Sequence, residues 1–144
     1  MKRPRDVVAA WVDAFNRRDP EAAAALYHED AVNWQVAAGE PMAGREAILA
    51  DFRKFFAAFP DTYTNIENLF EDGDWAILEW AGGGSWQSDF AGLKPNGRSF
   101  TLRGCGFFQV IEGKIGLQRG YWDKLTWFGQ LGIPAMAERP DPSG

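Results

Sequence analysis

The first half of the chain carries apolar residues at three- and four-residue spacing, which predicts amphipathic helices. Residues 6–18 predict the first helix, whose apolar positions are Val7, Val8, Trp11, Val12 and Phe15. Asp19 and Pro20 predict the start of a second, because Asp is a common N-cap and Pro fits the first helical position. Residues 45–59 predict a third helix that ends before Pro60. Its apolar stripe consists of Ile48, Leu49, Phe52, Phe55, Phe56 and Phe59.

After Pro60 apolar and polar residues alternate, which is the pattern of strands. Four strands are expected, over residues 62–70, 75–83, 98–111 and 115–122. A shorter strand, over residues 31–37, is expected between the second and third helices. The glycines at 82–84 predict a bulge or bend, beyond which residues 85–90 continue the strand. A phosphate-binding loop is not favoured there, because such a loop would open a helix.

The last helix is expected to begin after Asp123, which is placed to be its N-cap, and to end at Gly132. Three helices followed by a meander of strands predict one α+β domain over residues 1–134, with the helices on one face of an antiparallel sheet. A sheet curved around the Phe-rich third helix would leave a blind cavity at its open end for a ligand. The Pro-rich tail, residues 135–144, is expected to be flexible.

Composition narrows the possible partners. The chain has 144 residues, enough to bury a core of its own, and a net charge of -5. The negative charge argues against nucleic acid or an anionic membrane as partner, because both are bound through excess Lys and Arg. No apolar run is long enough to span a bilayer. Cys105 is the single cysteine and no signal peptide is recognised, so the cytoplasm is the expected location.

The chain is rich in aromatic residues, with seven Trp, eleven Phe and three Tyr. Such side chains fill cores, but they also line pockets for flat organic ligands. His28 and Cys105 have no partners at metal-ligand or triad spacing, so we expect a surface histidine and a cysteine that fills the core. Asp123, beside Tyr121 and Trp122 at a strand-to-helix junction, is the best candidate for acid/base chemistry. It is equally placed to be only a helix cap.

Several short motifs resemble a known family. They are Phe15-Asn16-Arg17-Arg18-Asp19, Leu26-Tyr27, Asp30-Ala31-Val32, Gly44-Arg45-Glu46-Ala47-Ile48, Gly113-Lys114-Ile115, Tyr121-Trp122-Asp123 and Gln130-Leu131-Gly132. Over residues 6–133 the chain is similar to the SnoaL-like polyketide cyclase branch of the nuclear transport factor 2-like superfamily. The resemblance implies a cone-shaped, curved antiparallel or mixed sheet wrapped around the N-terminal helices. It also implies a homodimer formed through the exposed sheet face.

The superfamily includes enzymes and proteins that only bind ligands, so its site residues must be compared singly. Where ketosteroid isomerases carry a tyrosine, an aspartate and a second acid, this chain has Trp11, Trp34 and Gly106. The Arg-x-Asp pair of limonene epoxide hydrolases is absent, and Gly120 stands where their last-strand aspartate would lie. The cyclase branch uses an aspartate near the end of the last strand, without metal or cofactor, and Asp123 most resembles it.

Two hypotheses follow. In the first, the protein is a cofactor-independent cyclase or isomerase that acts on a hydrophobic, polyketide-like carbonyl compound, with Asp123 as catalytic acid/base. In the second, the same pocket binds a small apolar molecule without turnover. No metal or cofactor is expected in either. The residues expected to bind substrate are Trp11, Asn33, Trp34, Trp80, Trp86, Arg103, Gln118, Tyr121 and Trp122. For each of them the alternative is a structural role in the core or at the surface.

Overall fold

The computed structural model describes residues 2–134, so the predicted flexible tail lies outside the described residues. Four α-helices, one short 3-10 helix and six strands follow each other along the chain. The helices are α1 (Pro4–Asn16), α2 (Pro20–Ala24), η1 (Val36–Ala38), α3 (Arg45–Ala58) and α4 (Lys124–Leu131). The strands are β1 (Tyr27–Gln35), β2 (Met42–Ala43), β3 (Tyr63–Asp72), β4 (Trp75–Ser85), β5 (Ser99–Ile111) and β6 (Lys114–Trp122).

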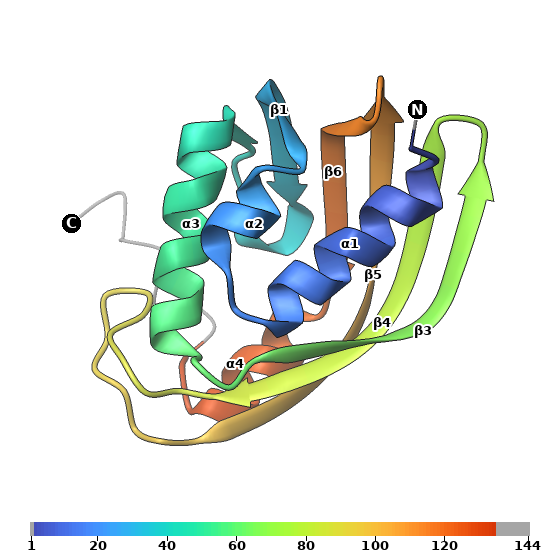
Figure 1. Ribbon diagram of the computed structural model, residues 1–144. Coiled ribbons are helices and arrows are strands. Elements are labelled where there is room, and N and C mark those ends of the chain that lie inside the picture. Colours follow the sequence, from blue (N-terminus) through green and yellow to red (C-terminus); the bar gives the residue numbers. More distant parts are fainter. Residues whose placement is uncertain (1, 135–144) are drawn as a thin grey trace, which may run out of the picture.

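The six strands form one mixed sheet in the order β2-β1-β6-β5-β4-β3. Strands β3 to β6 are the predicted antiparallel meander, and β1 adds to β6 in parallel. The sheet bends strongly along β3, β4 and β5, and α1, α2 and α3 lie within its concave side (Figure 1). This is the predicted α+β architecture. None of the helices in residues 2–134 is long and apolar enough to cross a membrane.

The first strand differs from the prediction. It begins at Tyr27 rather than Ala31, because α2 ends at Ala24 and Tyr27 already pairs with Ile115 of β6. The strand ends at Gln35 rather than at residue 37, because η1 begins at Val36.

The glycine-rich part of β4 lacks the bulge that was one of the two predicted alternatives, because Gly82 to Gly84 pair with Leu102 to Phe100 of β5 without a shift in register. The register shifts instead between Ile66 and Asn68, where Glu67 is the extra residue of β3, and opposite Gln109 and Val110 of β5, where Gly116 is the extra residue of β6. A Cβ atom on Gly82 or Gly83 would overlap the backbone of a neighbouring strand, so the glycines serve close approach rather than a bulge. Of residues 85–90 only Ser85 belongs to β4.

Two buried clusters make up the core. The larger lies between α1, α3 and the middle of the sheet, and its largest members are Trp11, Tyr27, Ile48, Phe52, Phe56, Leu78, Phe108 and Ile115. The smaller joins the end of α3 to α4, and its largest members are Phe59, Trp86, Phe100, Trp127, Phe128 and Leu131. Phe55 and Trp80, both half-buried, pack against both clusters. The space between the two clusters is where the structure leaves a pocket.

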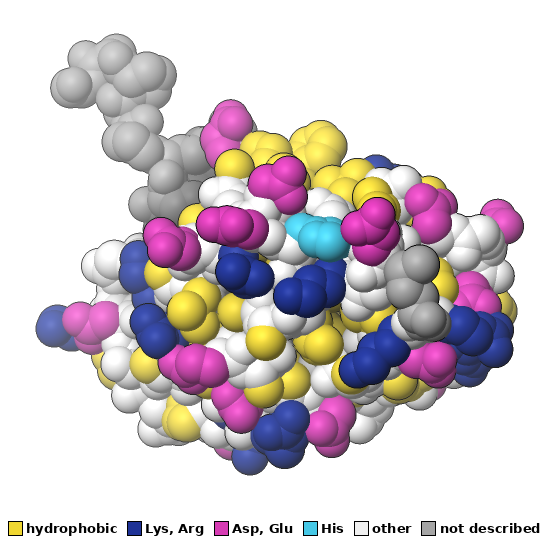
Figure 2. Space-filling view, turned by 45° about the horizontal axis from the view of Figure 1, so that its top comes forward, with side chains coloured by type: hydrophobic (Ala, Val, Ile, Leu, Met, Phe, Trp, Pro, Cys, Tyr) yellow, Lys and Arg dark blue, Asp and Glu magenta, His cyan; other side chains and the backbone are white. Residues whose placement is uncertain are grey.

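One face of the molecule carries charges of both signs. Figure 2 shows acidic and basic side chains interspersed over one face, with the histidine among them. His28 is partly exposed, as predicted, and its Nε2 contacts the carbonyl oxygen of Ile111. Cys105 is half-buried in β5 rather than a member of either core cluster. Within residues 2–134 no three His, Cys, Asp or Glu side chains come together as metal ligands would.

Candidate functional site

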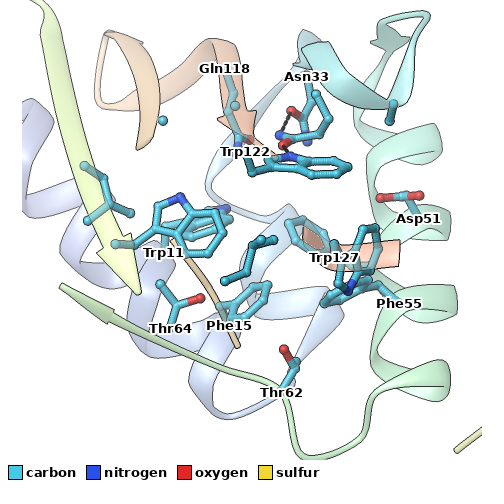
Figure 3. A pocket seen from close by; sticks show the side chains of 18 of the residues that line it. Trp11, Phe15, Asn33, Asp51, Phe55, Thr62, Thr64, Gln118, Trp122 and Trp127 are labelled. Atoms are coloured by element: carbon cyan, nitrogen blue, oxygen red, sulfur yellow. Dashed lines mark hydrogen bonds between the residues drawn. The ribbon is translucent and has the colours of Figure 1, made fainter. Parts of the chain in front are cut away.

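A cavity of about 260 Å³ lies on the concave side of the sheet. Its walls are mainly aromatic and come from α1, α3, α4, the strands β4, β5 and β6, and the loop after β4. These aromatic residues are Trp11, Phe15, Phe52, Phe55, Trp80, Phe90, Phe100, Phe108, Trp122 and Trp127. Figure 3 shows these rings surrounding a common space, with Trp11 and Phe15 opposite Phe55 and Trp127. A cavity of this kind suits a flat, apolar organic ligand.

A few polar side chains interrupt the aromatic wall: Asn33, Gln35, Asp51, Thr62, Thr64 and Gln118. Thr62 donates its hydroxyl proton to the Gly83 carbonyl, 2.9 Å away. Among the described residues that line the cavity, Asp51 alone has a side chain that carries a formal charge at neutral pH. Besides the hydroxyl groups of Tyr63 and Thr64, the site therefore offers three amides and one carboxyl group.

One chain of hydrogen bonds joins Trp122, Gln35 and Asn33 (Figure 3). The indole Nε1 of Trp122 donates to Oε1 of Gln35 at 2.9 Å. The Nε2 of Gln35 then donates to Oδ1 of Asn33 at 2.8 Å. The side-chain carbonyl oxygen of Asn33 is thereby hydrogen-bonded within the protein.

A second chain joins Trp11, Tyr27 and Gln118. The indole Nε1 of Trp11 donates to the Tyr27 hydroxyl at 2.8 Å, and that hydroxyl donates to Oε1 of Gln118. Complete burial raises the pKa of Tyr27 far above its ordinary value, so its hydroxyl keeps the proton that it donates. The carbonyl oxygen of Gln118 is thus also occupied.

In the first chain the Trp122 indole fixes the direction, because an indole N–H can donate but not accept. In the second chain the direction is given by the Tyr27 hydroxyl, which donates to Oε1 of Gln118. Each chain therefore ends with an amide nitrogen. Within residues 2–134 no hydrogen bond satisfies Nδ2 of Asn33 or Nε2 of Gln118. Asn33 and Gln118 are register partners in the parallel β1–β6 pair, and both are buried pocket residues. Two N–H donors from neighbouring strands therefore converge on the cavity.

Asp51 of α3 supplies the carboxyl group. It lines the cavity yet remains solvent-exposed, which puts it where the cavity opens to water. Desolvation by the surrounding protein raises the pKa of Asp51, and the nearby Lys54 opposes this only in part. A carboxyl group with a raised pKa is closer to the range in which it can exchange protons at neutral pH.

Sequence reasoning missed Asp51 and Gln35. Asp51 follows Ile48 by three residues and precedes Phe55 by four, so it flanks the apolar stripe of α3, and this spacing could have shown it. Gln35 shares a strand face with Asn33 by alternation. Neither residue type stands out from ordinary surface polarity without its spatial neighbours.

Five of the nine predicted substrate-binding residues line the cavity, namely Trp11, Asn33, Trp80, Gln118 and Trp122. The other four lie elsewhere. Trp34 is on the outer side of β1, where its indole donates to the Gly39 carbonyl. Trp86 is buried in the smaller core cluster. Arg103 and Tyr121 lie on the convex face of the sheet, the first near Glu67 and the second edge-on to Phe107.

Asp123 is a helix cap, which is the structural alternative to catalysis that the sequence left open. Its carboxylate accepts hydrogen bonds from the backbone nitrogens of Leu125 and Thr126 and from the Thr126 hydroxyl, which makes it the N-cap of α4. These bonds, chiefly that from the Thr126 hydroxyl, lower the pKa of Asp123. The side chain lies outside the aromatic cavity and borders a shallow depression that includes Tyr63 and Arg103. A catalytic role for Asp123 remains a prediction that these contacts do not favour.

Trp127 is a further polar group at the cavity. Its ring stands edge-on to Trp122, with centroids 5.2 Å apart, and is surrounded by the rings of Phe55, Phe59, Phe90, Phe100 and Phe128. In the described part of the chain, its Nε1 is the side-chain polar atom that is both completely buried and without a hydrogen-bond partner. The smaller core cluster therefore contains an unused N–H donor beside the ligand space.

Comparisons with known proteins agree with this architecture. The chain is 27% identical to aklanonic acid methyl ester cyclase DnrD of Streptomyces peucetius, a match that covers 100% of this chain and 98% of that protein. The crystal structure of IdmH, a putative polyketide cyclase of Streptomyces antibioticus, superposes with a TM-score of 0.76 at 28% identity, covering 92% of this chain and 100% of IdmH. A protein from Catenulispora acidiphila with a ketosteroid isomerase-like fold superposes with a TM-score of 0.78 at 23% identity, covering 93% and 97%. Because the family model for SnoaL-like polyketide cyclases matches residues 5–131, the chain belongs to the SnoaL-like polyketide cyclase family.

Proposed function

We propose that this protein is an enzyme that catalyses acid/base chemistry, of the cyclase or isomerase type, on a neutral and hydrophobic carbonyl compound without a cofactor. The observation that carries the proposal is the convergence of the Asn33 and Gln118 donors and the Asp51 carboxyl on one aromatic cavity. In this proposal Asn33 and Gln118 bind the carbonyl oxygen, and Asp51 moves the proton.

The donors suit an enolate better than a ketone. When a base removes a proton from the carbon beside a carbonyl, negative charge moves to the carbonyl oxygen. Fixed N–H donors stabilise that charge at little reorganisation cost, and each is typically worth about 10²- to 10³-fold in rate. The two indole-anchored chains hold the amide nitrogens of Asn33 and Gln118 in place before the substrate binds.

In a ring closure, Asp51 would accept the proton from the carbon, and the enolate carbon would then attack a second carbonyl of the same molecule. The new alkoxide would take up a proton, so no atom is gained or lost. General acid/base groups of this kind contribute about 10²- to 10⁴-fold. The absence of Lys, Arg and His from the described lining favours a neutral ligand, because an anionic group would have no counter-charge.

The test is enolisation of a simple probe, 2-tetralone, measured as exchange of its C1 hydrogens for deuterium in D₂O by proton NMR. We expect the wild type to accelerate exchange above the buffer rate and Asp51→Asn to lose about 10²-fold or more of that acceleration. Asp123→Asn is the matched control, since it changes the other candidate carboxyl while keeping a good cap. Loss of exchange in Asp123→Asn but not in Asp51→Asn would contradict the assignment of Asp51.

The same experiment tests the alternative function. If 2-tetralone quenches tryptophan fluorescence on binding but no variant, wild type included, accelerates exchange, the pocket is a binding site without turnover. That outcome would overturn the enzymatic proposal while leaving the ligand class unchanged.

We also propose a homodimer through the convex sheet face and a cytoplasmic location. The dimer is supported by exposed apolar side chains, with Phe70 57%, Ile111 45% and Tyr121 41% exposed. Analytical ultracentrifugation should give a dimer that Tyr121→Glu dissociates, whereas Leu125→Glu, on α4, should leave it intact. A wild-type monomer at micromolar concentration would contradict the proposal. The location is supported only by the single cysteine.

A further inference from the structure

We propose that Gln35 is a positioning residue that decides which end of the Asn33 amide faces the ligand, and that Gly120 provides the space in which Gln35 does so. The inference rests on the proposed role of Asn33 as a donor to the carbonyl oxygen. It assigns to Gln35 no contact with the reacting atoms.

The space for Gln35 comes from the neighbouring strand. Gln35 and Gly120 are register partners in the β1–β6 pair. A Cβ atom on Gly120 would lie 2.7 Å from Cδ and 2.8 Å from Nε2 of Gln35, well inside contact distance. The Gln35 amide therefore occupies the volume that a side chain at position 120 would fill. Any residue other than glycine there would displace it.

Through its two hydrogen bonds, Gln35 links the orientation of the Asn33 amide to the Trp122 indole. The Trp122 indole can only donate, so it selects the oxygen of the Gln35 amide. That leaves the Gln35 nitrogen to select the oxygen of Asn33, and the Asn33 nitrogen is left for the ligand. Without Gln35, no described hydrogen bond would distinguish the two ends of the Asn33 side chain. A reversed Asn33 amide would place its N–H donors against those of Gln35.

Replacement of Gln35 by the isosteric Glu provides the decisive test, because the introduced carboxyl can take both roles. While protonated, it can accept from Trp122 and donate to Asn33, as Gln35 does. Once ionised, it can only accept, so Asn33 must turn its nitrogen toward it and its oxygen toward the cavity. The donor character of the site then depends on pH in the variant and not in the parent.

The titrating groups around the site have to be separated from this effect. Asp51 from α3 and Tyr63 from β3 are the other titratable residues among the described lining. Arg119 of β6 packs against Trp75 and Phe107 instead of lining the cavity. The measurement therefore uses an Asp51→Asn background and stays between pH 4 and pH 9, below the ordinary tyrosine range.

The readout is the Kd of 2-tetralone, a ketone that stays neutral in this range, from the quenching of tryptophan fluorescence. In Asp51→Asn we expect a Kd that does not change with pH. In Gln35→Glu/Asp51→Asn we expect the same Kd at low pH and binding at least tenfold weaker above the titration of the introduced carboxyl. A Kd that is flat with pH in the double variant, whether unchanged or uniformly weaker, would overturn the inference.

A second readout keeps the test independent of the probe. In ¹H–¹⁵N spectra of Gln35→Glu/Asp51→Asn, the Asn33 side-chain NH₂ resonances should titrate together with the Trp122 indole resonance, because both groups then donate to a carboxylate. Titration of Trp122 alone would show that Asn33 does not turn and would also overturn the inference. Failure of the proposed function would look different, since it would abolish deuterium exchange in the wild type without removing this titration.

Discussion

Asn33 of β1 and Gln118 of β6 are paired residues of two parallel strands, and each uses its carbonyl oxygen for a hydrogen bond within the protein. Their nitrogens have no hydrogen bond within residues 2–134, and both residues line the same cavity. Each chain of hydrogen bonds begins at a tryptophan. Trp11 and Trp122 therefore line the cavity and also orient the polar side chains in its wall. The predictions below separate these roles.

Gly120→Ala should displace the Gln35 side chain, because the new methyl group would fill the space of its amide, while strand β6 stays intact. We expect at least a tenfold loss of 2-tetralone exchange, because Asn33 loses the group that fixes its amide. Gly116→Ala is the control on the same strand, where a new Cβ would meet only Ile111 at 3.4 Å and Gln109 and His28 at 4.0 Å. Equal exchange rates in Gly120→Ala and Gly116→Ala would show that Gly120 has no special role.

Tyr27→Phe should interrupt the second chain. The change leaves the Trp11 indole and the Gln118 oxygen without their buried partner, and such a loss costs about 1–3 kcal/mol of unfolding free energy. Urea unfolding followed by circular dichroism measures this cost. We also expect roughly tenfold slower exchange, because the Gln118 amide can then reverse. A variant with wild-type stability would show that the Tyr27 hydroxyl is not part of a satisfied network.

Asp51→Asn should raise stability at neutral pH. The folded protein binds the Asp51 proton more tightly than the unfolded chain does, because desolvation raises the pKa in the fold. Ionisation of Asp51 therefore lowers stability as the pH rises above the ordinary Asp value of about 3.9. We expect the Tm of Asp51→Asn at pH 7 to exceed that of the wild type by roughly 1–3 °C. The gain should vanish toward pH 3, and a gain independent of pH would contradict this account.

Asp123→Ala should show the opposite dependence. Hydrogen bonds hold the pKa of Asp123 below its ordinary value in the folded protein. Its contribution to stability is therefore complete above about pH 3.9 and is lost as the pH falls through the lowered pKa. Scanning calorimetry at pH 7 should give a Tm roughly 2–5 °C below the wild type. Asp123→Asn should recover most of this loss, because Asn is also a good N-cap.

Gly129→Ala tests helix α4 apart from the site. Gly129 is exposed in the middle of the helix, and a Cβ added there would meet no atom within 4 Å. Alanine should therefore stabilise the protein by about 0.5–1 kcal/mol, because glycine loses more backbone freedom on folding. Denaturant unfolding measures the gain, and the exchange rate should stay at its wild-type value. Destabilisation would show that α4 is strained at this position.

Much of the fold could be predicted because its signals are local. The Asp19 and Asp123 caps, the end of α3 before Pro60 and the left-handed Gly132 after α4 each follow from neighbouring residues, and the structure confirms them. The alternation in β4 to β6 likewise located three strands to within a few residues.

The site was harder to predict because it depends on strand register. A shift of one residue exchanges the two faces of a strand, so Trp34 was assigned to the ligand although its neighbours Asn33 and Gln35 face the cavity. The same alternation separates Tyr121, on the convex face, from Trp122 in the pocket.

The sequence alone determined the helices, the caps of α2 and α4, the end of α3, the meander of strands and the aromatic character of the interior, since these follow from periodicity and capping over a few residues. The tertiary structure decided which polar groups meet. The parallel pairing of β1 with β6 brings Asn33 beside Gln118 and Gln35 into the space left by Gly120. It also decided that Asp51, on the flank of α3, lies at the cavity, and that Asp123 is a cap outside it. The contacts between β1, β6 and α3 join residues far apart in the chain, and no local pattern encodes which of them meet.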